Sequence, residues 1–336
     1  MMLRFWALTA GCLAVVVLGG RPERILATSL ATDLVQPLDQ ASPRLRFHLG
    51  EVANNQPLIS STLPDIPGSP SPYYIAQWQQ SHYIRPDILL RDDLATFDPK
   101  LGVARYGFEA SDGHAHVWLY QSGQTWVYDL YEAGGTLRAG GGSNVFLSTD
   151  HFASGATLDK AVVVDFNAKL SKAAVDAPRE AQMSGAVLAH AFAGFGLLFT
   201  GNAKDIPQFV FLQIPITASR PFTRAARAAC VGEGALLYAP PLSHGERTLP
   251  FAPDLGALQH FHYRLNDYLS GLLSVQRCGS EGWPAAAHDP ANWRVTGFYI
   301  GLETETSDER PTSKLAGPQG YAEEGMQIAN LRITRD

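Results

Sequence analysis

Arg294-Val-Thr-Gly-Phe-Tyr-Ile-Gly-Leu-Glu303 and Met326-Gln-Ile-Ala-Asn-Leu-Arg-Ile-Thr334 are the clearest of the short stretches that decide the fold class of this chain. Both are rich in β-branched and aromatic residues that recur at a period of two, which is typical of a half-buried β-strand. Turns rich in Gly and Pro separate further runs of this kind, near residues 103–109, 114–121, 124–132, 144–148, 158–170, 184–200, 208–217, 235–238 and 258–265. The pattern predicts an all-β fold, a β-sandwich or jelly roll, with a barrel as the alternative.

One short amphipathic helix is expected within this all-β fold, over residues 267–277. Asn266 or Asp267 can cap its start, the apolar residues that follow fall near helical spacing, and Gly279 provides a stop. We expect the helix to cover one end of the sandwich.

The N-terminus reads as a signal peptide. A basic start at Met1-Met-Leu-Arg4 precedes an uncharged apolar run from Phe5 to Gly20. Cleavage after Ala27 fits best. Cleavage after Gly20, or retention of the segment as an uncleaved anchor, remains open. The chain is therefore expected to be secreted or periplasmic.

The 336-residue chain carries a net charge of −6, and loss of residues 1–27 would remove three Arg and one Glu and bring it to −8. A mildly acidic body without a Lys/Arg cluster argues against nucleic acid or an anionic membrane as a partner. No stretch after the signal segment is apolar for long enough to span a bilayer, so the mature chain is expected to lack a membrane span. The sequence contains no signal for an oligomeric state.

The mature chain divides into two parts in this reading. Residues 28–72 hold one alternating run, Arg44-Leu-Arg-Phe-His-Leu49, and then a Pro-rich loop or linker that begins near Pro57. Residues 73–336 form the β-sandwich domain.

Two cysteines, Cys230 and Cys278, remain once the signal segment with Cys12 is removed. In an oxidising compartment we expect them to form a disulfide, with two separate buried thiols as the alternative. Cys12 ends a stretch similar to a lipoprotein signal, but it lies inside the apolar run, which argues against lipidation.

The motifs of the most readable enzyme classes are absent from the sequence: there is no Gly-x-Ser-x-Gly elbow, His-Glu-x-x-His, Cys-x-x-Cys or phosphate loop. Gly232-Glu-Gly234 lacks the third glycine of a dinucleotide fingerprint. We therefore predict no cofactor and no metal centre. Chemistry built from scattered strand residues stays possible.

The candidate site is a predicted hairpin of residues 114–121 and 124–132, joined at Ser122-Gly123. A two-residue loop at that point would pair Gln121 with Gln124. One face of the hairpin would then be apolar and face the core. The other face would carry six chemically active side chains: His114, His116, Trp118, Tyr120, Asp129 and Tyr131.

In this register His116 lies opposite Asp129, close enough for the carboxylate to orient the imidazole. We predict His116, Asp129 and Tyr131 as catalytic residues, because an oriented His beside a Tyr hydroxyl can act as general base and acid. His114, Trp118 and Tyr120 are predicted to bind ligand, since aromatic rings stack on sugars. The structural alternative is that this face packs against a second layer or is a solvated outer sheet.

Two weaker patterns accompany the hairpin. His260 and His262 share one face of a strand, as two metal ligands would, but the sequence supplies no third ligand. Glu303 and Glu305 also share a face, and paired carboxylates can serve glycoside hydrolysis, although charges at a strand end are usually just solvated.

The leading hypothesis is an exported β-sandwich protein that binds or processes carbohydrate, with chemistry similar to that of a polysaccharide lyase or a glycosidase. The alternative is a non-enzymatic cell-envelope or adhesion module, in which the hairpin face packs internally or meets a protein. The hypotheses differ in the exposure of His116, Trp118 and Tyr120.

Overall fold

The structure is a computed structural model that describes residues 31–41, 45–51, 56–62, 69–78, 84–89, 105–110, 114–122, 125–134, 141–152, 156–184, 187–201, 207–220, 226–231, 234–241, 248–254, 256–279, 282–306 and 320–336. The predicted signal segment and its cleavage positions lie outside these ranges. The described strands form two β-sheets, called sheet A and sheet B here.

Sheet A consists of antiparallel neighbours throughout. Its order is β15 (Gln259–Arg264), β10 (Val162–Asp176), β17 (Tyr321–Arg335), β8 (Thr125–Gly134), β7 (Ala115–Ser122), β6 (Arg105–Ala110) and β5 (Ile84–Leu89). The two-residue strand β1 (Thr32–Asp33) pairs with the end of β17. Two long strands far apart in the sequence, β10 and β17, thus lie side by side in this sheet.

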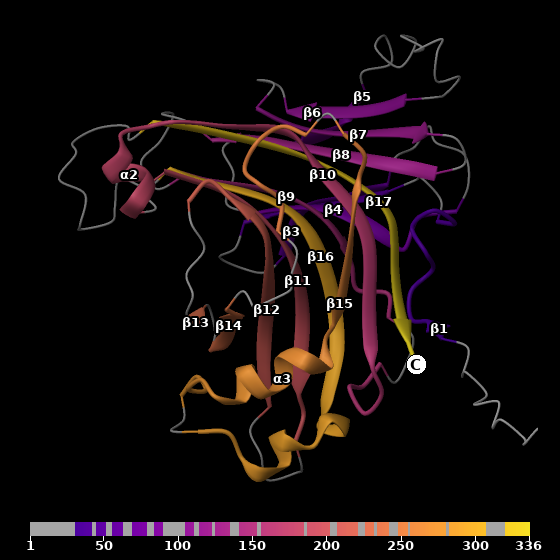
Figure 1. The fold of residues 1–336 in the computed structure, drawn as a ribbon. Coiled ribbons are helices and arrows are strands. Elements are labelled where there is room, and N and C mark those ends of the chain that lie inside the picture. The colour runs from indigo at the N-terminus through magenta and orange to yellow at the C-terminus, as the bar shows by residue number, and fades with distance from the viewer. Residues whose placement is uncertain are drawn as a thin grey trace, which may run out of the picture. The chain divides into compact units, whose positions relative to one another are not determined.

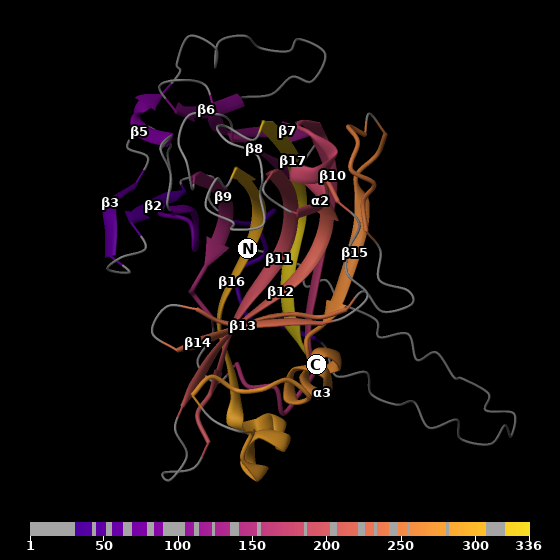
Figure 2. The same ribbon diagram turned by 90° about the vertical axis from the view of Figure 1, so that its left-hand side faces the viewer.

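Sheet B has one more described strand than sheet A, and it contains both parallel and antiparallel pairs. Its order is β13 (Arg227–Val231), β14 (Ala235–Ala239), β12 (Gln208–Ala218), β11 (Val187–Phe199), β16 (Trp293–Thr306), β9 (Gly141–Thr149), β4 (Tyr73–Trp78), β2 (Arg46–Glu51) and β3 (Gln56–Thr62). The pairs β12–β14 and β2–β4 are parallel, and the other pairs are antiparallel. Figure 2 shows β9, β16, β11 and β12 side by side.

The core lies between the two sheets, as the alternating pattern predicts. Inward side chains of sheet A, such as Tyr128 and Phe166, and of sheet B, such as Phe195 and Phe298, belong to one buried cluster. The prediction of an all-β sandwich is therefore confirmed. In Figure 1 the long strands of both sheets bend in the same direction, and sheet B lies on the inner side of the bend. Each sheet also has an outer face, turned away from the core and called its free face here.

Near the helix α2 (Arg179–Ser184) this interior contains two acids. Glu132 of β8 and Glu324 of β17 are directly opposite each other and fully buried. Burial raises the pKa of Glu324 well above its ordinary value, because water no longer stabilises the charged form. Neither oxygen of Glu324 has a hydrogen-bond partner among the described residues.

The helices differ in part from the expectation. The predicted helix is α3 (Asn266–Leu273), which ends before residue 277, and the short helix α2 was not predicted. Two 3₁₀ turns, η2 (Ala285–His288) and η3 (Pro290–Asn292), precede β16. The Pro-rich stretch also holds a strand, β3, which is the outermost strand of sheet B. An edge strand tolerates Pro57, because one side of its backbone needs no ladder hydrogen bond.

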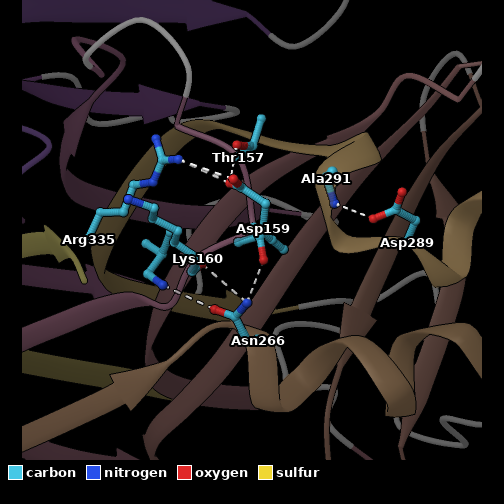
Figure 3. A network of polar contacts seen from close by, with 9 residues as sticks. Thr157, Asp159, Lys160, Asn266, Asp289, Ala291 and Arg335 are labelled. Atoms are coloured by element: carbon cyan, nitrogen blue, oxygen red, sulfur yellow. Dashed lines mark hydrogen bonds and ion pairs between the residues drawn. The ribbon is translucent and has the colours of Figure 1, made fainter.

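Asn266 does not cap α3 as predicted but joins it to the turn before β10 (Figure 3). Its Oδ1 accepts from the backbone N–H of Val162 at 3.0 Å, and its Nδ2 donates to the carbonyl of Leu158 at 2.7 Å. Asp159 of the same turn forms an ion pair with Arg335 at the end of β17, with 3.1 Å between Oδ1 and the guanidinium nitrogen. These contacts fix one end of sheet A against α3.

Cys230 and Cys278 form a disulfide, with their Cα atoms 5.7 Å apart, so this prediction is confirmed. The bond joins the edge strand β13 to the segment that follows α3. Among the described residues, no helix has the length and hydropathy required to cross a bilayer.

Candidate functional site

The hairpin of β7 and β8 is present, but its register differs from the predicted one. Ser122 pairs with Thr125, so the connection falls at residues 123–124 instead of 122–123. Every residue therefore faces a partner two positions further along than predicted. A shift of two conserves the faces. Val117, Leu119 and Leu130 are buried in the core, as expected.

The predicted pairing of His116 with Asp129 is wrong because of this shift. His116 lies opposite Tyr131, and the two rings stack with centroids 4.7 Å apart and planes 20° apart. Asp129 lies opposite Trp118 instead. A tyrosine ring, rather than a carboxylate, is thus the direct cross-strand neighbour of the imidazole.

Asp129 of β8 is bound by side chains of β17, the next strand of sheet A, and of β10, the strand beyond it. Its Oδ1 accepts from Ser171 Oγ of β10 at 2.8 Å, and its Oδ2 accepts from Gln327 Nε2 of β17 at 3.1 Å. Both carboxylate oxygens are therefore used in a network that crosses three strands.

Tyr131 belongs to a second network on the same face. Its hydroxyl and that of Tyr321 both donate to Glu323 Oε2, each at 3.0 Å, and Lys172 Nζ lies 3.3 Å from Glu323 Oε1. Burial first, and then the bonds to Tyr321 and Glu323, raise the pKa of Tyr131. This phenol keeps its proton and serves as a hydrogen-bond donor to the carboxylate.

Trp118 is the buried member of the predicted set, with 5% of its surface exposed. Its ring meets the His116 ring edge-on, with centroids 5.9 Å apart. The other five residues are partly exposed: His114, His116, Tyr120, Asp129 and Tyr131. The hairpin thus places all six residues on the free face of sheet A, but the indole ring of Trp118 is buried beneath the surface.

His260 and His262 share the free face of β15, and both contact one oxygen of Asp165 on β10. Their ring nitrogens lie 3.1 and 2.8 Å from Asp165 Oδ1. No group of three His, Cys, Asp or Glu side chains suited to a metal ion occurs within the described ranges.

The free face of sheet B contains a histidine–carboxylate pair that was not predicted from the sequence. His190 of β11 lies opposite Glu303 of β16, with Nε2 3.1 Å from Oε2. Their side chains are 25% and 27% exposed, so both remain accessible to a ligand. Glu303 was predicted beside Glu305, whose side chain lies outside the described residues.

Aromatic side chains extend from this pair across the same face. Phe192 follows His190 on β11, and the two rings meet edge-on with centroids 5.2 Å apart. Phe192 and Phe146 are buried, whereas Tyr299 is partly exposed. Burial raises the pKa of Tyr299, so this ring remains a neutral phenol.

The chemistry of this face follows from its composition. An imidazole held by a carboxylate can accept and return a proton, and partly buried aromatic rings offer apolar surface to a ligand. Gln213 adds an amide, whose Nε2 lies 3.5 Å from the hydroxyl of Tyr299. Glu303 is the one carboxylate among the described side chains of β4, β9, β11, β12 and β16 on this face. The face therefore resembles acid–base machinery built on a single carboxylate and a histidine.

Comparison with known proteins gives a fold likeness alone. No family model matches the chain, and no curated protein matches it. Among solved structures it is similar to a family 11 xylanase from Neocallimastix patriciarum, at 12% identity and a TM-score of 0.33, over 70% of this chain and 92% of that one. It is also similar to endoglucanase cel12A from Rhodothermus marinus, at 8% identity and a TM-score of 0.34, over 69% and 92%. Similarity at this level supports no assignment of family, substrate or site residues.

Proposed function

We propose that this protein is an exported carbohydrate-active protein that binds saccharide on the free face of sheet B and processes it there. The observation that carries the proposal is the His190–Glu303 pair at 3.1 Å, a quarter exposed and continuous with a row of aromatic rings. The hydroxyl groups of a sugar need polar partners, and its C–H groups need apolar surface. This face offers both within one sheet.

The curvature of the sandwich favours sheet B over sheet A. Because sheet B lies on the inner side of the bend, its free face is the concave one (Figure 1). Ligand sites are usually concave and combine apolar walls with a few polar groups. His190 and Glu303 are the polar groups of that kind here.

The pair is suited to proton transfer. Glu303 accepts a hydrogen bond from His190 Nε2, which leaves the second ring nitrogen, Nδ1, to exchange a proton with a ligand. That nitrogen can take a proton from a saccharide group or return it after protonation. General acid–base catalysis by His190, with Glu303 holding its ring, is the reaction type that the geometry supports.

Export is part of the proposal. The basic start and apolar run of residues 1–20 form a signal segment, and the Cys230–Cys278 disulfide suits an oxidising compartment. Expression with the natural N-terminus in a bacterium should give a mature protein outside the cytoplasm that starts near Thr28. Mass spectrometry that finds Met1 on soluble cytoplasmic protein would refute the export step.

The test of the function is a polysaccharide screen that reads retention together with new reducing or unsaturated ends. The panel includes xylans, β-glucans and polymers that contain uronic acids. We expect retention of at least one polymer by the wild type, and loss of any new ends in Glu303→Gln. If the wild type retains no polymer and produces no new ends, the proposal is wrong.

The hairpin face of sheet A is the second candidate. His116 stacked on Tyr131, with Tyr131 bound to Glu323, supports a site built from the predicted residues. In this case His114, Trp118 and Tyr120 would contact the ligand, and the burial of Trp118 requires that its ring become uncovered. If this face instead meets a protein, the molecule is a non-enzymatic envelope or adhesion module. Loss of the new ends in His116→Ala but not in His190→Ala would favour the hairpin.

A further inference from the structure

Gly194 of β11 leaves room for the ring of Tyr299, which lies directly opposite on β16. A Cβ atom at position 194 would lie within 3.0 Å of the Cζ, Cε2 and Cε1 atoms of that ring. Because three ring carbons, and not a single edge atom, lie this close to the Cβ position, the ring of Tyr299 lies over Gly194. The absence of a side chain at residue 194 is therefore what allows this tyrosine to lie down on the sheet.

Two upright rings hold Tyr299 in that orientation. Its plane is nearly perpendicular to that of Phe146, at 77° with centroids 5.4 Å apart, and to that of Phe192, at 88° and 5.9 Å. On the far side of Gly194, Gln213 of β12 approaches the phenol oxygen at 3.5 Å. One face of the Tyr299 ring therefore rests on the sheet, and the other points away from it.

We propose that Tyr299 is the stacking platform for a pyranose ring, and that Gly194 is the positioning residue that keeps the platform flat. This inference rests on the proposed function and adds the residue that holds the ligand. A pyranose whose hydroxyls are all equatorial presents axial C–H groups on its faces, so that such a face is apolar. Sugars of glucose or xylose configuration fit a flat aromatic ring in this way, whereas an axial hydroxyl, as in mannose, interrupts the contact.

The distance to the acid–base pair sets the length of the ligand. Gly194 and His190 are four residues apart on β11, as are Tyr299 and Glu303 on β16, which corresponds to about 13 Å along a strand. A single pyranose ring is shorter than this. The ligand that uses both the platform and the pair is therefore an oligosaccharide, and a monosaccharide uses one or the other.

The experiment measures affinity for a polymer retained by the wild type and for its short oligosaccharides, by titration calorimetry. Tyr299→Ala removes the platform and should weaken binding by roughly tenfold or more, as aromatic anchors do. Gly194→Ala should give a similar loss, because the new methyl group lifts the ring. Tyr299→Phe keeps the ring and should bind within about threefold of the wild type.

Gly282→Ala is the matched control, because a Cβ at residue 282 meets no atom within 4 Å. It should bind as the wild type does. The double variant Gly194→Ala/Tyr299→Ala should lose no more affinity than Tyr299→Ala alone, since both changes act on one ring. Circular dichroism and melting curves identify a variant that fails to fold, and Tyr299→Ala then carries the test, because it adds no atoms.

The outcomes separate the inference from the function beneath it. If the wild type binds a glycan and both Tyr299→Ala and Gly194→Ala bind it equally well, the platform is wrong and the proposed function stands. Additive losses in the double variant would also overturn the positioning role of Gly194. If the wild type binds no glycan, the proposed function fails, and the inference fails with it.

Discussion

On the free face of sheet A, Asp129 and Glu323 each use both carboxylate oxygens within the protein, bound by Ser171, Gln327, two tyrosines and a lysine. On the free face of sheet B, Glu303 has one described partner, His190. The two faces contain the same kinds of residue. Carboxylates whose acceptors are already taken stiffen a sheet, whereas a carboxylate with one histidine partner leaves that histidine available to a ligand.

The largest expected effect concerns the acid–base pair of sheet B. On a polysaccharide that the wild type turns over, Glu303→Gln and His190→Ala should lower kcat by roughly 10²–10⁴-fold, the usual contribution of a general acid–base group. Binding should change little, because these groups act mainly on the transition state. Asp129→Asn on sheet A is the control and should stay within a few-fold of the wild type. Equal losses at the two faces would remove the distinction between them.

Trp118 tests whether the hairpin face packs or binds. Since its ring is buried, Trp118→Ala should destabilise the fold by about 3–5 kcal/mol, measured by denaturant unfolding. Tyr120→Ala, on the same strand and face but partly exposed, should cost less. A Trp118→Ala protein that unfolds like the wild type but no longer retains saccharide would move the binding site to sheet A.

The interior between the two faces gives a prediction on pH. Burial raises the folded-state pKa of Glu324 above its unfolded value. The contribution of this group to folding stability is therefore fully present below the unfolded pKa and is lost as pH rises through the folded pKa. Between the two pKa values the loss is about 1.4 kcal/mol for each pH unit. Glu324→Gln cannot ionise, so its melting temperature should fall less than that of the wild type between pH 5 and pH 9.

Glu180→Gln is the control for this prediction, because Glu180 is exposed on α2 at the same end of the molecule. It should follow the pH profile of the wild type. If Glu324→Gln also follows that profile, Glu324 does not titrate over this range in the folded protein.

The smallest expected effect compares the two carboxylates as structural groups. Asp129→Asn places an amide donor against Gln327, and should lower the free energy of unfolding by about 1–2 kcal/mol. Glu303→Gln loses one partly exposed pair and should change it by less than about 1 kcal/mol. Urea unfolding of both variants measures the difference. The reverse order would mean that Glu303 is the structural group and Asp129 the available one.

Local patterns in the sequence predicted the sandwich and the buried face of the hairpin, because burial on one face of a strand imposes a period of two. The register of the hairpin was wrong, since Ser122-Gly123 and Gly123-Gln124 are both acceptable turns and the pattern does not choose between them. The disulfide followed from the number of cysteines and the expected oxidising compartment, with no geometry required.

The His190–Glu303 pair could not be found in this way, because 113 residues separate its members. No local periodicity states that β11 pairs with β16. The signal that was available is the single histidine within Val187–Phe199, a strand otherwise made of apolar residues and glycine. A lone polar residue on the free face of such a strand has its partner on another strand, and Glu303, at the end of its own strand, was already a candidate.

The position of β17 has a consequence for the order in which the chain folds. This strand ends at Arg335 and lies between β10 and β8, so the centre of sheet A cannot form until the ribosome has passed that residue. Contacts between distant segments fold slowly, because a long loop must close first. A growing chain of this topology cannot complete sheet A before its last strand has been made. The core between the two sheets can therefore close only after β17 has been made.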